Sequence, residues 1–364
     1  MKLGKSSIAE LAAKLKEENE KIRDFLVPTQ EIHITAEENP SLVMDNRGAI
    51  ETFQINENAH RQIAERIGVP YKYYDRMRRT YPELLAENVN GWFTKEPEER
   101  MLRTLGGTAR AFLSNKYRRI DNLDLLQAVY PVIQEMDGVS VVSCEVTESH
   151  LYLQMVTDKV STEVAKGDII QAGFIISNSE IGLGAVSVQP LLYRLVCTNG
   201  MVCNENGHKR YHTGKRIDIE DNFELYTDNT KLLDDMAYFA KVQDVVRAAV
   251  DETRFNQQVI AMQKAIGVEI NPMTITHVVE ELGKTCLLTR PEQEAVVQNF
   301  LLGDTTSDGN HIAHFNQFGL SNAITKTANT APDYERAVEL EKIGGNILFA
   351  DLDTLLSDKK IVAA

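Results

Sequence analysis

Cationic and aromatic side chains are concentrated in the segment 110–122, which reads RAFLSNKYRRIDN. Its four cations and two rings belong to Arg110, Phe112, Lys116, Tyr117, Arg118 and Arg119. A strand over 109–114 would place Arg110 and Phe112 on one face, because alternate residues of a strand share a face. The other three cations would precede a helix capped by Asn122, and the free backbone N–H groups at a helix N-terminus attract phosphate.

This combination of residue types suits single-stranded nucleic acid, because cations pair with the phosphates while aromatic rings stack on the bases. We predict phosphate contacts for the four cations, Arg110, Lys116, Arg118 and Arg119. We predict base stacking for the two rings, Phe112 and Tyr117. The alternative interpretation is that both rings belong to the hydrophobic core and that the cations form a solvated rim.

A second group of cations lies in the segment 71–79, YKYYDRMRR, within a helix that Pro70 is expected to begin. Lys72, Arg76 and Arg79 are spaced i, i+4, i+7, so they form one stripe along the helix. We predict that this stripe follows a phosphate backbone. A different, more apolar stripe has the pattern typical of a surface that packs on a core, and it consists of Tyr73, Met77 and Tyr81.

Two cysteines and two histidines follow one another with the spacing C-x5-C-x4-H-x3-H, at Cys197, Cys203, His208 and His212. Two thiolates and two imidazoles can hold zinc tetrahedrally, but the opening pair is wider than the C-x2–4-C of a zinc finger. Because Cys197 ends an apolar run, a buried small side chain is the simpler interpretation. We therefore predict no metal site and no other cofactor.

The sequence lacks the common catalytic motifs G-x-x-x-x-G-K-[ST], H-E-x-x-H and G-x-S-x-G, so we predict no catalytic residues and a non-enzymatic function. Four cysteines in 364 residues are too few for a disulfide scaffold, and no apolar run approaches the ~18 residues of a membrane span. The N-terminal segment also lacks the apolar centre of a secretory signal. We expect a cytoplasmic protein that makes no membrane contact.

The charge of the chain is unevenly distributed. The formal net charge is −14, from 39 basic and 53 acidic residues. Residues 60–119 hold 13 Lys and Arg against 7 Asp and Glu, whereas residues 217–364 hold 12 against 24. A strongly acidic protein repels nucleic acid unless its charge is segregated, so the basic stretch is the expected polyanion-facing part. The alternative is that these charges lie on solvated helix faces.

The hydrophobic patterns predict an α+β fold, with a β-rich mixed N-terminal domain followed by a mostly helical C-terminal domain. We predict a helix over 6–25, strands over 29–35 and 49–55, and helices that begin at Asn56 and Pro70. A strand-rich run follows over 167–203, and helical periodicity sets in from residue 228. The expected divisions are an N-terminal helix (1–27), an α+β domain that is the candidate nucleic-acid-binding part (28–216) and an acidic helical domain (217–364).

Several stretches resemble a phage- and plasmid-encoded family known as domain-of-unknown-function family 932. They are RAFLSNKYRRIDN (110–122), LVCTNGMV (195–202), HTG (212–214) and NAITKTANTAPDYERAVELEKIGG (322–345). The resemblance covers most of residues 30–350. It implies an origin in a mobile element and a cytoplasmic location in a bacterial host, and it supplies no catalytic residue.

More distantly, the order of strands and helices and the division of charge are similar to phage single-strand annealing proteins of the RecT/Redβ type. That similarity implies a DNA-binding α+β core, a separate helical region, a homo-oligomer and no nucleotide requirement. The chain departs from these proteins in length, and no diagnostic motif aligns. We therefore predict a non-enzymatic nucleic-acid-binding protein of a phage or plasmid, which binds and anneals single-stranded DNA in recombination. The alternative is an acidic protein-interaction or host-modulating protein that acts in counter-defence, in which residues 217–364 contact a protein partner and no DNA is bound.

Overall fold

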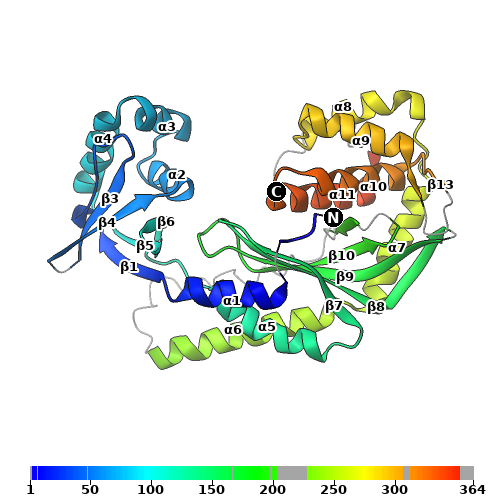
Figure 1. Cartoon of the computed structure of the whole chain (residues 1–364), viewed down its shortest axis with the longest axis horizontal. Coiled ribbons are helices and arrows are strands. Elements are labelled where there is room, and N and C mark those ends of the chain that lie inside the picture. The colour runs from blue at the N-terminus through cyan, green and yellow to red at the C-terminus, as the bar shows by residue number, and fades with distance from the viewer. Residues whose placement is uncertain are drawn as a thin grey trace. The chain divides into compact units, whose positions relative to one another are not determined.

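The computed structural model describes residues 2–5, 7–46, 48–165, 167–196, 199–203, 228–305 and 311–352. The chain forms two compact units, unit 1 and unit 2, whose elements are labelled in Figure 1. Unit 2 consists of Ala12–Leu123 and Ser179–Gly184. Unit 1 consists of Met1–Leu11, Asp124–Asn178 and Ala185–Ala364. The domain boundary expected between residues 216 and 217 lies outside the described residues.

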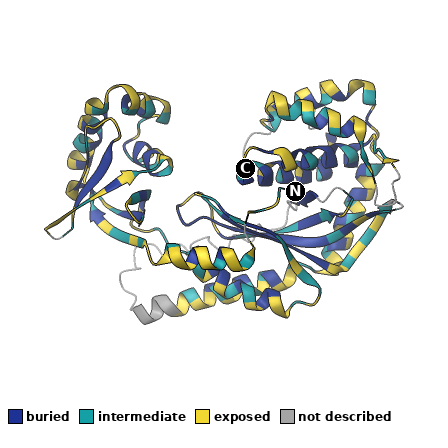
Figure 2. Cartoon of the chain, in the orientation of Figure 1, coloured by how far each residue is buried: buried dark blue, intermediate teal, exposed yellow. Residues whose placement is uncertain are grey.

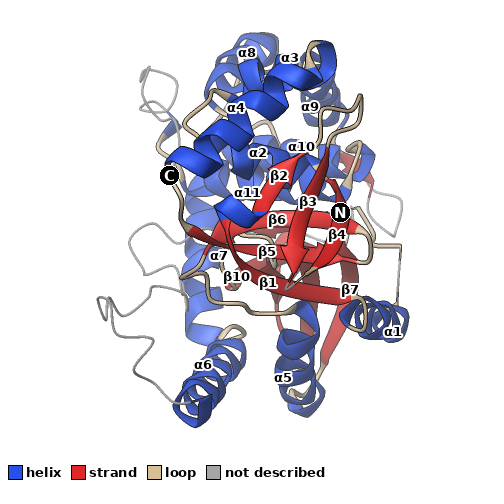
Figure 3. Cartoon of the chain, turned by 90° about the vertical axis from the view of Figure 1, so that its left-hand side faces the viewer, coloured by secondary structure: helices blue, strands red, loops and turns tan. Residues whose placement is uncertain are grey.

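Unit 2 is built on a six-stranded sheet with the order β1-β5-β6-β4-β3-β2. Its neighbouring strands are antiparallel except β4 and β6, which are parallel. The strands are β1 (Ile22–Pro28), β2 (Ile32–Ile34), β3 (Ser41–Asn46), β4 (Ala49–Ile55), β5 (Glu99–Leu105) and β6 (Thr108–Ser114). The helices between β4 and β5 are α2 (Glu57–Arg66), α3 (Tyr71–Thr80) and α4 (Pro82–Lys95), and Figure 3 colours them apart from the strands.

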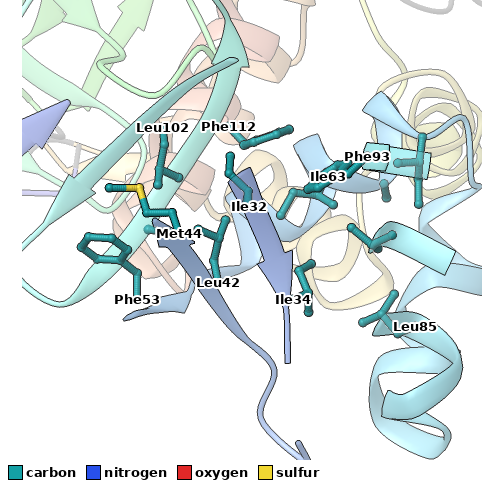
Figure 4. Close-up of a cluster of buried hydrophobic side chains, with 14 of the residues drawn as sticks. Ile32, Ile34, Leu42, Met44, Phe53, Ile63, Leu85, Phe93, Leu102 and Phe112 are labelled. Carbon is teal, nitrogen blue, oxygen red and sulfur yellow. The ribbon is translucent and has the colours of Figure 1, made fainter. Parts of the chain in front are cut away.

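The core of unit 2 is formed by side chains from the sheet together with side chains from α2, α3 and α4 (Figure 4). The strands contribute Ile32, Ile34, Leu42, Met44, Phe53, Leu102 and Phe112, and the helices contribute Ile63, Leu85 and Phe93. Removing this apolar surface from water is what holds the three helices on the sheet. The opposite sides of the helices are therefore free to carry polar residues.

Local sequence signals explain where α2 and α3 begin. Asn56 caps α2, because its Oδ1 accepts a hydrogen bond from the backbone N–H of Ala59 at 2.9 Å. Gly68 follows α2 with a φ of +66°, a conformation that suits glycine, and α3 begins directly after Pro70. The predicted helices after Asn56 and Pro70 are confirmed, as is the strand over 49–55.

The N-terminal helix is shorter than predicted. Helix α1 spans Ile8–Asn19, and its predicted continuation to residue 25 is wrong, because Ile22–Pro28 forms β1 and pairs with β5. Ile22, Phe25 and Val27 are β-branched or aromatic residues that favour a strand, and pairing with β5 satisfies the backbone groups. The strand expected over 29–35 is reduced to β2, because Thr29–Glu31 forms a 3-10 turn.

Unit 1 is built on a five-stranded antiparallel sheet with the order β11-β10-β9-β8-β7. Its strands are β7 (Val139–Val146), β8 (Leu151–Ala165), β9 (Asp168–Asn178), β10 (Ser187–Arg194) and β11 (Asn199–Val202), with a short pair formed by β12 (Asp304–Thr305) and β13 (His311–Ile312). The α-helices described in this part are α5 (Asn122–Glu135), α6 (Asp228–Ala248), α7 (Glu252–Ile266), α8 (Ile275–Thr285), α9 (Arg290–Leu302), α10 (Gln317–Thr327) and α11 (Tyr334–Phe349). Buried residues of β9, β10 and β11 pack against α7, α10 and α11, and Figure 2 shows how far each element is buried.

The predicted fold class is confirmed. In the described ranges, the long strands all precede residue 203, and residues 228–305 and 311–352 are helical apart from the short strands β12 and β13 and the connecting loops. Strand-rich sequence at 167–203 forms β9, β10 and β11, as expected. The fold is therefore α+β with a helical C-terminal part.

None of the helices in the described ranges is long and apolar enough to cross a bilayer. These ranges also contain no group of three or more His, Cys, Asp and Glu residues placed to hold a metal ion. Among the four residues considered for zinc, Cys197, His208 and His212 lie outside the described part of the chain, and Cys203 is buried.

Candidate nucleic-acid interface

The solvent-facing side of α3 carries a group of cations. Lys72, Arg76 and Arg79 are exposed, and the exposed residues beside them on the helix are Tyr73 and Thr80. At 3.6 residues per turn, these five positions lie within one arc of the helix surface. We call these five residues the α3 face. The predicted stripe of three cations is thus solvent-facing, and no acidic side chain belongs to it.

The opposite side of α3 is fixed by packing. Tyr74 and Met77 are buried in the core of unit 2. The Tyr74 hydroxyl is hydrogen-bonded to Nδ1 of His60 on α2, at 2.9 Å. Burial, reinforced by the nearby Arg78 charge, lowers the pKa of His60 to about 4, so its ring is neutral at pH 7. This uncharged buried contact orients α3 and directs the α3 face outward.

Two carboxylates neutralise part of the positive charge of α3. Glu57 accepts hydrogen bonds from the Tyr71 hydroxyl at 2.6 Å and from the Arg78 guanidinium at 3.0 Å. Asp75 pairs with both Arg78 and Arg79, and its distance to Arg79 Nε is 2.8 Å. The Arg79 side chain remains 71% exposed in spite of this ion pair. With four cations and one carboxylate, the ten residues of α3 have a net charge of +3.

The apolar stripe predicted for α3 is only partly correct. Met77 is a core residue, as expected. Tyr73 and Tyr81, by contrast, are 51% and 56% exposed. The helical pattern misled here because Tyr73 lies at the edge of the exposed arc, and Tyr81 follows the last helical residue with φ −142° and ψ 69°. The spacing of these residues in the sequence therefore does not reveal that two rings near the cations are exposed.

The first residues of segment 110–122 point inward. Arg110 forms an ion pair with Glu180 at 2.8 Å, and only 11% of its side chain is exposed. Phe112 is 2% exposed and stacks on Phe93 in the core, with ring centroids 5.5 Å apart. No face of the Phe112 ring is left for a nucleic-acid base, so its predicted stacking role is wrong. The alternative interpretation, a core side chain, is correct for Phe112.

The remaining residues of the segment are divided between the interior and the solvent. Tyr117 is half-buried, its hydroxyl donates a hydrogen bond to the Ser179 carbonyl at 3.2 Å, and burial raises its pKa. Arg119 is exposed but pairs with Asp24 at 2.9 Å. Lys116 is exposed and Arg118 is half-buried. In this segment Arg110 and Arg119 are thus held by carboxylates. In the α3 face Arg79 pairs with Asp75, whereas Lys72 and Arg76 form no ion pair in the described part of the chain.

A buried arginine that no sequence motif indicates helps to explain this inward orientation. Arg103 on β5 has a fully buried side chain and pairs with Asp24 on β1 and with Asp121. It also donates a hydrogen bond to the Glu180 carbonyl at 2.7 Å. The only signal in the sequence is an arginine within the apolar run MLRTL, and that pattern does not reveal its partners.

A second charged cluster, in unit 1, is neutralised internally. Arg194 binds the buried Asp168 carboxylate through Nε and Nη2, at 2.7 and 2.8 Å, and its Nη1 also pairs with Asp304. Lys326 pairs with Asp304 at 2.7 Å, and His314 Nε2 lies 3.5 Å from Asp168. These residues tie β9 and β10 to β12 and α10. Because each permanent cation has a carboxylate partner, this cluster is a structural network, and the α3 face is the better candidate site.

Comparisons with known proteins give limited information about the site. Neither the curated proteins nor the solved structures include a significant match to the chain. A family model covers less than a third of the chain, from β6 to beyond β11, and the α3 face lies before this span. Residues 111–216 match the family described as "Domain of unknown function (DUF932)", and this part of the chain is similar to that family.

Proposed function

We propose that the chain is a non-enzymatic nucleic-acid-binding protein whose α3 face contacts the phosphates of a single strand. Three exposed cations on one side of a helix, with no exposed carboxylate among them, support this proposal. Annealing of strands, assembly into a homo-oligomer and an origin in a phage or plasmid belong to the same proposal and rest on the family resemblance.

The division of charge between the units favours binding at this position. Unit 2 contains 18 Lys and Arg against 19 Asp and Glu, which leaves 21 against 34 for unit 1. The phosphate backbone of a nucleic acid is therefore repelled by the net negative charge of unit 1, whereas unit 2 is close to neutral overall. Within unit 2, the +3 charge of α3 is a local attraction, and such phosphate contacts supply most of non-specific nucleic-acid affinity.

Reversing two charges of the α3 face should weaken binding of a single-stranded oligomer by at least about tenfold. Lys72→Glu with Arg76→Glu is the suitable pair, because neither residue forms an ion pair in the described part of the chain. Each phosphate contact contributes roughly −0.7 to the slope of log affinity against log salt concentration. Because the double variant loses two such contacts, its slope should be less negative than that of the wild type by about 1.4. Fluorescence anisotropy of a labelled 30-nucleotide strand, titrated at several salt concentrations, measures both quantities.

The matched control is Lys16→Glu with Lys95→Glu. Both lysines are exposed residues of unit 2, on α1 and α4, and the pair changes the net charge by the same amount. This control should retain nearly the wild-type affinity. Equal losses in the two double variants, or wild-type binding by the α3 variant, would show that the α3 face is not the site.

The charge of unit 1 supports a competing proposal, that the acidic C-terminal region contacts a protein partner and that no nucleic acid is bound. Absence of binding to single strands even at low salt would favour this second function. The absorbance ratio of the purified protein at 260 and 280 nm is a first discriminator, because a nucleic-acid-binding protein of this kind tends to co-purify with its ligand.

A further inference from the structure

Two tyrosine rings next to the α3 cations have no partner in the described part of the chain. Tyr73 and Tyr81 are more than half exposed, and neither side chain takes part in a hydrogen bond or ring contact there. The other tyrosines of α3 are engaged: Tyr71 donates its hydroxyl to Glu57, and Tyr74 is bonded to His60. The two free rings therefore differ from the structural tyrosines of the same helix.

The two tyrosines lie at separate points along α3, Tyr73 in its first turn and Tyr81 directly after its last residue. Tyr73 is three residues before Arg76, so the two side chains are neighbours on the helix surface. Tyr81 follows Thr80 at the junction of α3 and α4. Eight residues at 1.5 Å per residue separate the backbone positions of Tyr73 and Tyr81 by roughly 12 Å along the helix axis. Since stacked bases are about 3.4 Å apart, the rings would contact two different bases.

Acidic residues restrict the path that a strand can take. Glu83 and Glu87 are exposed on α4, directly after Tyr81. These carboxylates repel phosphate, whereas Lys72 and Arg76 on α3 attract it. The favourable path for a phosphate backbone therefore runs along α3 and ends near Tyr81.

We propose that Tyr73 and Tyr81 stack on unpaired bases of a strand whose phosphates lie against Lys72 and Arg76. This inference rests on the proposed function and specifies its ligand as single-stranded, because the base faces of a duplex are already stacked on one another. Exposed rings beside cations match the two requirements of single-strand binding, which are base stacking and backbone neutralisation. A duplex presents phosphates and groove edges on its outer surface, so it exposes no base face on which these rings could stack.

Removing both rings should weaken binding to a single strand without changing the electrostatic contribution. Tyr73→Ala with Tyr81→Ala should lower the affinity for a mixed-sequence 30-nucleotide strand by roughly five- to a hundred-fold per ring that stacks. The slope of log affinity against log salt should stay at its wild-type value, because no cation is lost. An abasic oligomer with the same number of phosphates should bind the wild type and the variant equally.

The control is Tyr73→Phe with Tyr81→Phe, which keeps the rings and removes only the hydroxyls. This variant should bind the strand as the wild type does, and a duplex of the same sequence should bind the wild type more weakly than the single strand. Unchanged single-strand affinity in the alanine variant, or equal affinity of the wild type for duplex and single strand, would overturn the stacking inference alone. Failure of the wild type to bind any of the three probes at low salt would overturn the proposed function and the stacking together.

Discussion

Replacement of Arg103 by methionine should lower the free energy of unfolding of unit 2 by about 3–5 kcal/mol, the range typical for breaking a buried ion pair from one side. Methionine replaces the aliphatic part of the arginine side chain, is shorter, and donates no hydrogen bond. The measurement is urea unfolding followed by the fluorescence of Trp92. This residue is the single tryptophan of the chain and lies on α4 of unit 2, so its signal reports on this unit.

The expected loss is large because the Arg103 side chain is fully buried among groups that need it. Its Nε and Nη2 donate to Asp24 at 2.8 and 3.2 Å, and Nη2 also donates to Asp121 at 2.6 Å. Burial alone would raise the pKa of Asp24, but the hydrogen bonds from Arg103 and Arg119 bring it below its ordinary value. Without Arg103, the Asp121 carboxylate loses this partner and Asp24 keeps only Arg119, so desolvated negative charge is left uncompensated.

The matched control is Arg23→Met, one residue before Asp24 on the same strand. Arg23 pairs with Glu51, but half of its side chain is exposed, and such surface pairs contribute at most about 1 kcal/mol. The Arg23→Met control should therefore lower the free energy of unfolding of unit 2 only slightly. A loss below about 1 kcal/mol in Arg103→Met would contradict the view that this network joins β1, β5 and the segment after β6.

The Arg103 network also explains why the segment 110–122 was misinterpreted from sequence. A run of cations and rings indicates nucleic-acid binding only if the side chains are free. Here Arg119 pairs with Asp24, 95 residues earlier, and Arg110 pairs with Glu180, 70 residues later. No local pattern reveals partners at such separations. A double variant in which Arg118 and Arg119 are both replaced by glutamate would consequently be a poor test of binding, because a glutamate at position 119 would face Asp24 and destabilise the unit.

The cation stripe of the α3 face was easier to predict, because its position on the helix depends only on residues within the same ten-residue helix. Pro70 and the period of 3.6 residues place Lys72, Arg76 and Arg79 on one side of the helix, whatever the rest of the chain does. Burial of Tyr74 and Met77 then determines which side faces the solvent. The sequence could not separate the exposed ring of Tyr73 from a core ring, because that distinction depends on packing against α2.

The same dependence on distant partners applies to a buried carboxylate of unit 1. Glu341 on α11 is 1% exposed and accepts a hydrogen bond from Gln154 Nε2 on β8 at 2.7 Å. Its other oxygen, Oε1, has no hydrogen-bond partner among the described residues. The hydrogen-bonded chain continues from Gln154 through Tyr334 to Ser143, which accepts from the backbone N–H of Gly4 at 2.9 Å. In the sequence, Glu341 is one of several acidic residues on an amphipathic helix and is not distinguishable from them.

We expect the stability of unit 1 to fall by about 3 kcal/mol between pH 4.5 and pH 7, because burial raises the pKa of Glu341 from 4.5 to about 7. Over this interval the folded chain retains a proton that the unfolded chain has lost, so raising the pH favours unfolding. Glu341→Gln removes the titration, and its free energy of unfolding, measured by urea and far-UV circular dichroism at pH 5 and pH 8, should change less with pH than that of the wild type. Glu339→Gln, an exposed position on the same helix, should leave the wild-type pH dependence intact. If wild type and Glu341→Gln lose equal stability between the two pH values, Glu341 is charged in the folded protein and its burial is compensated by another group.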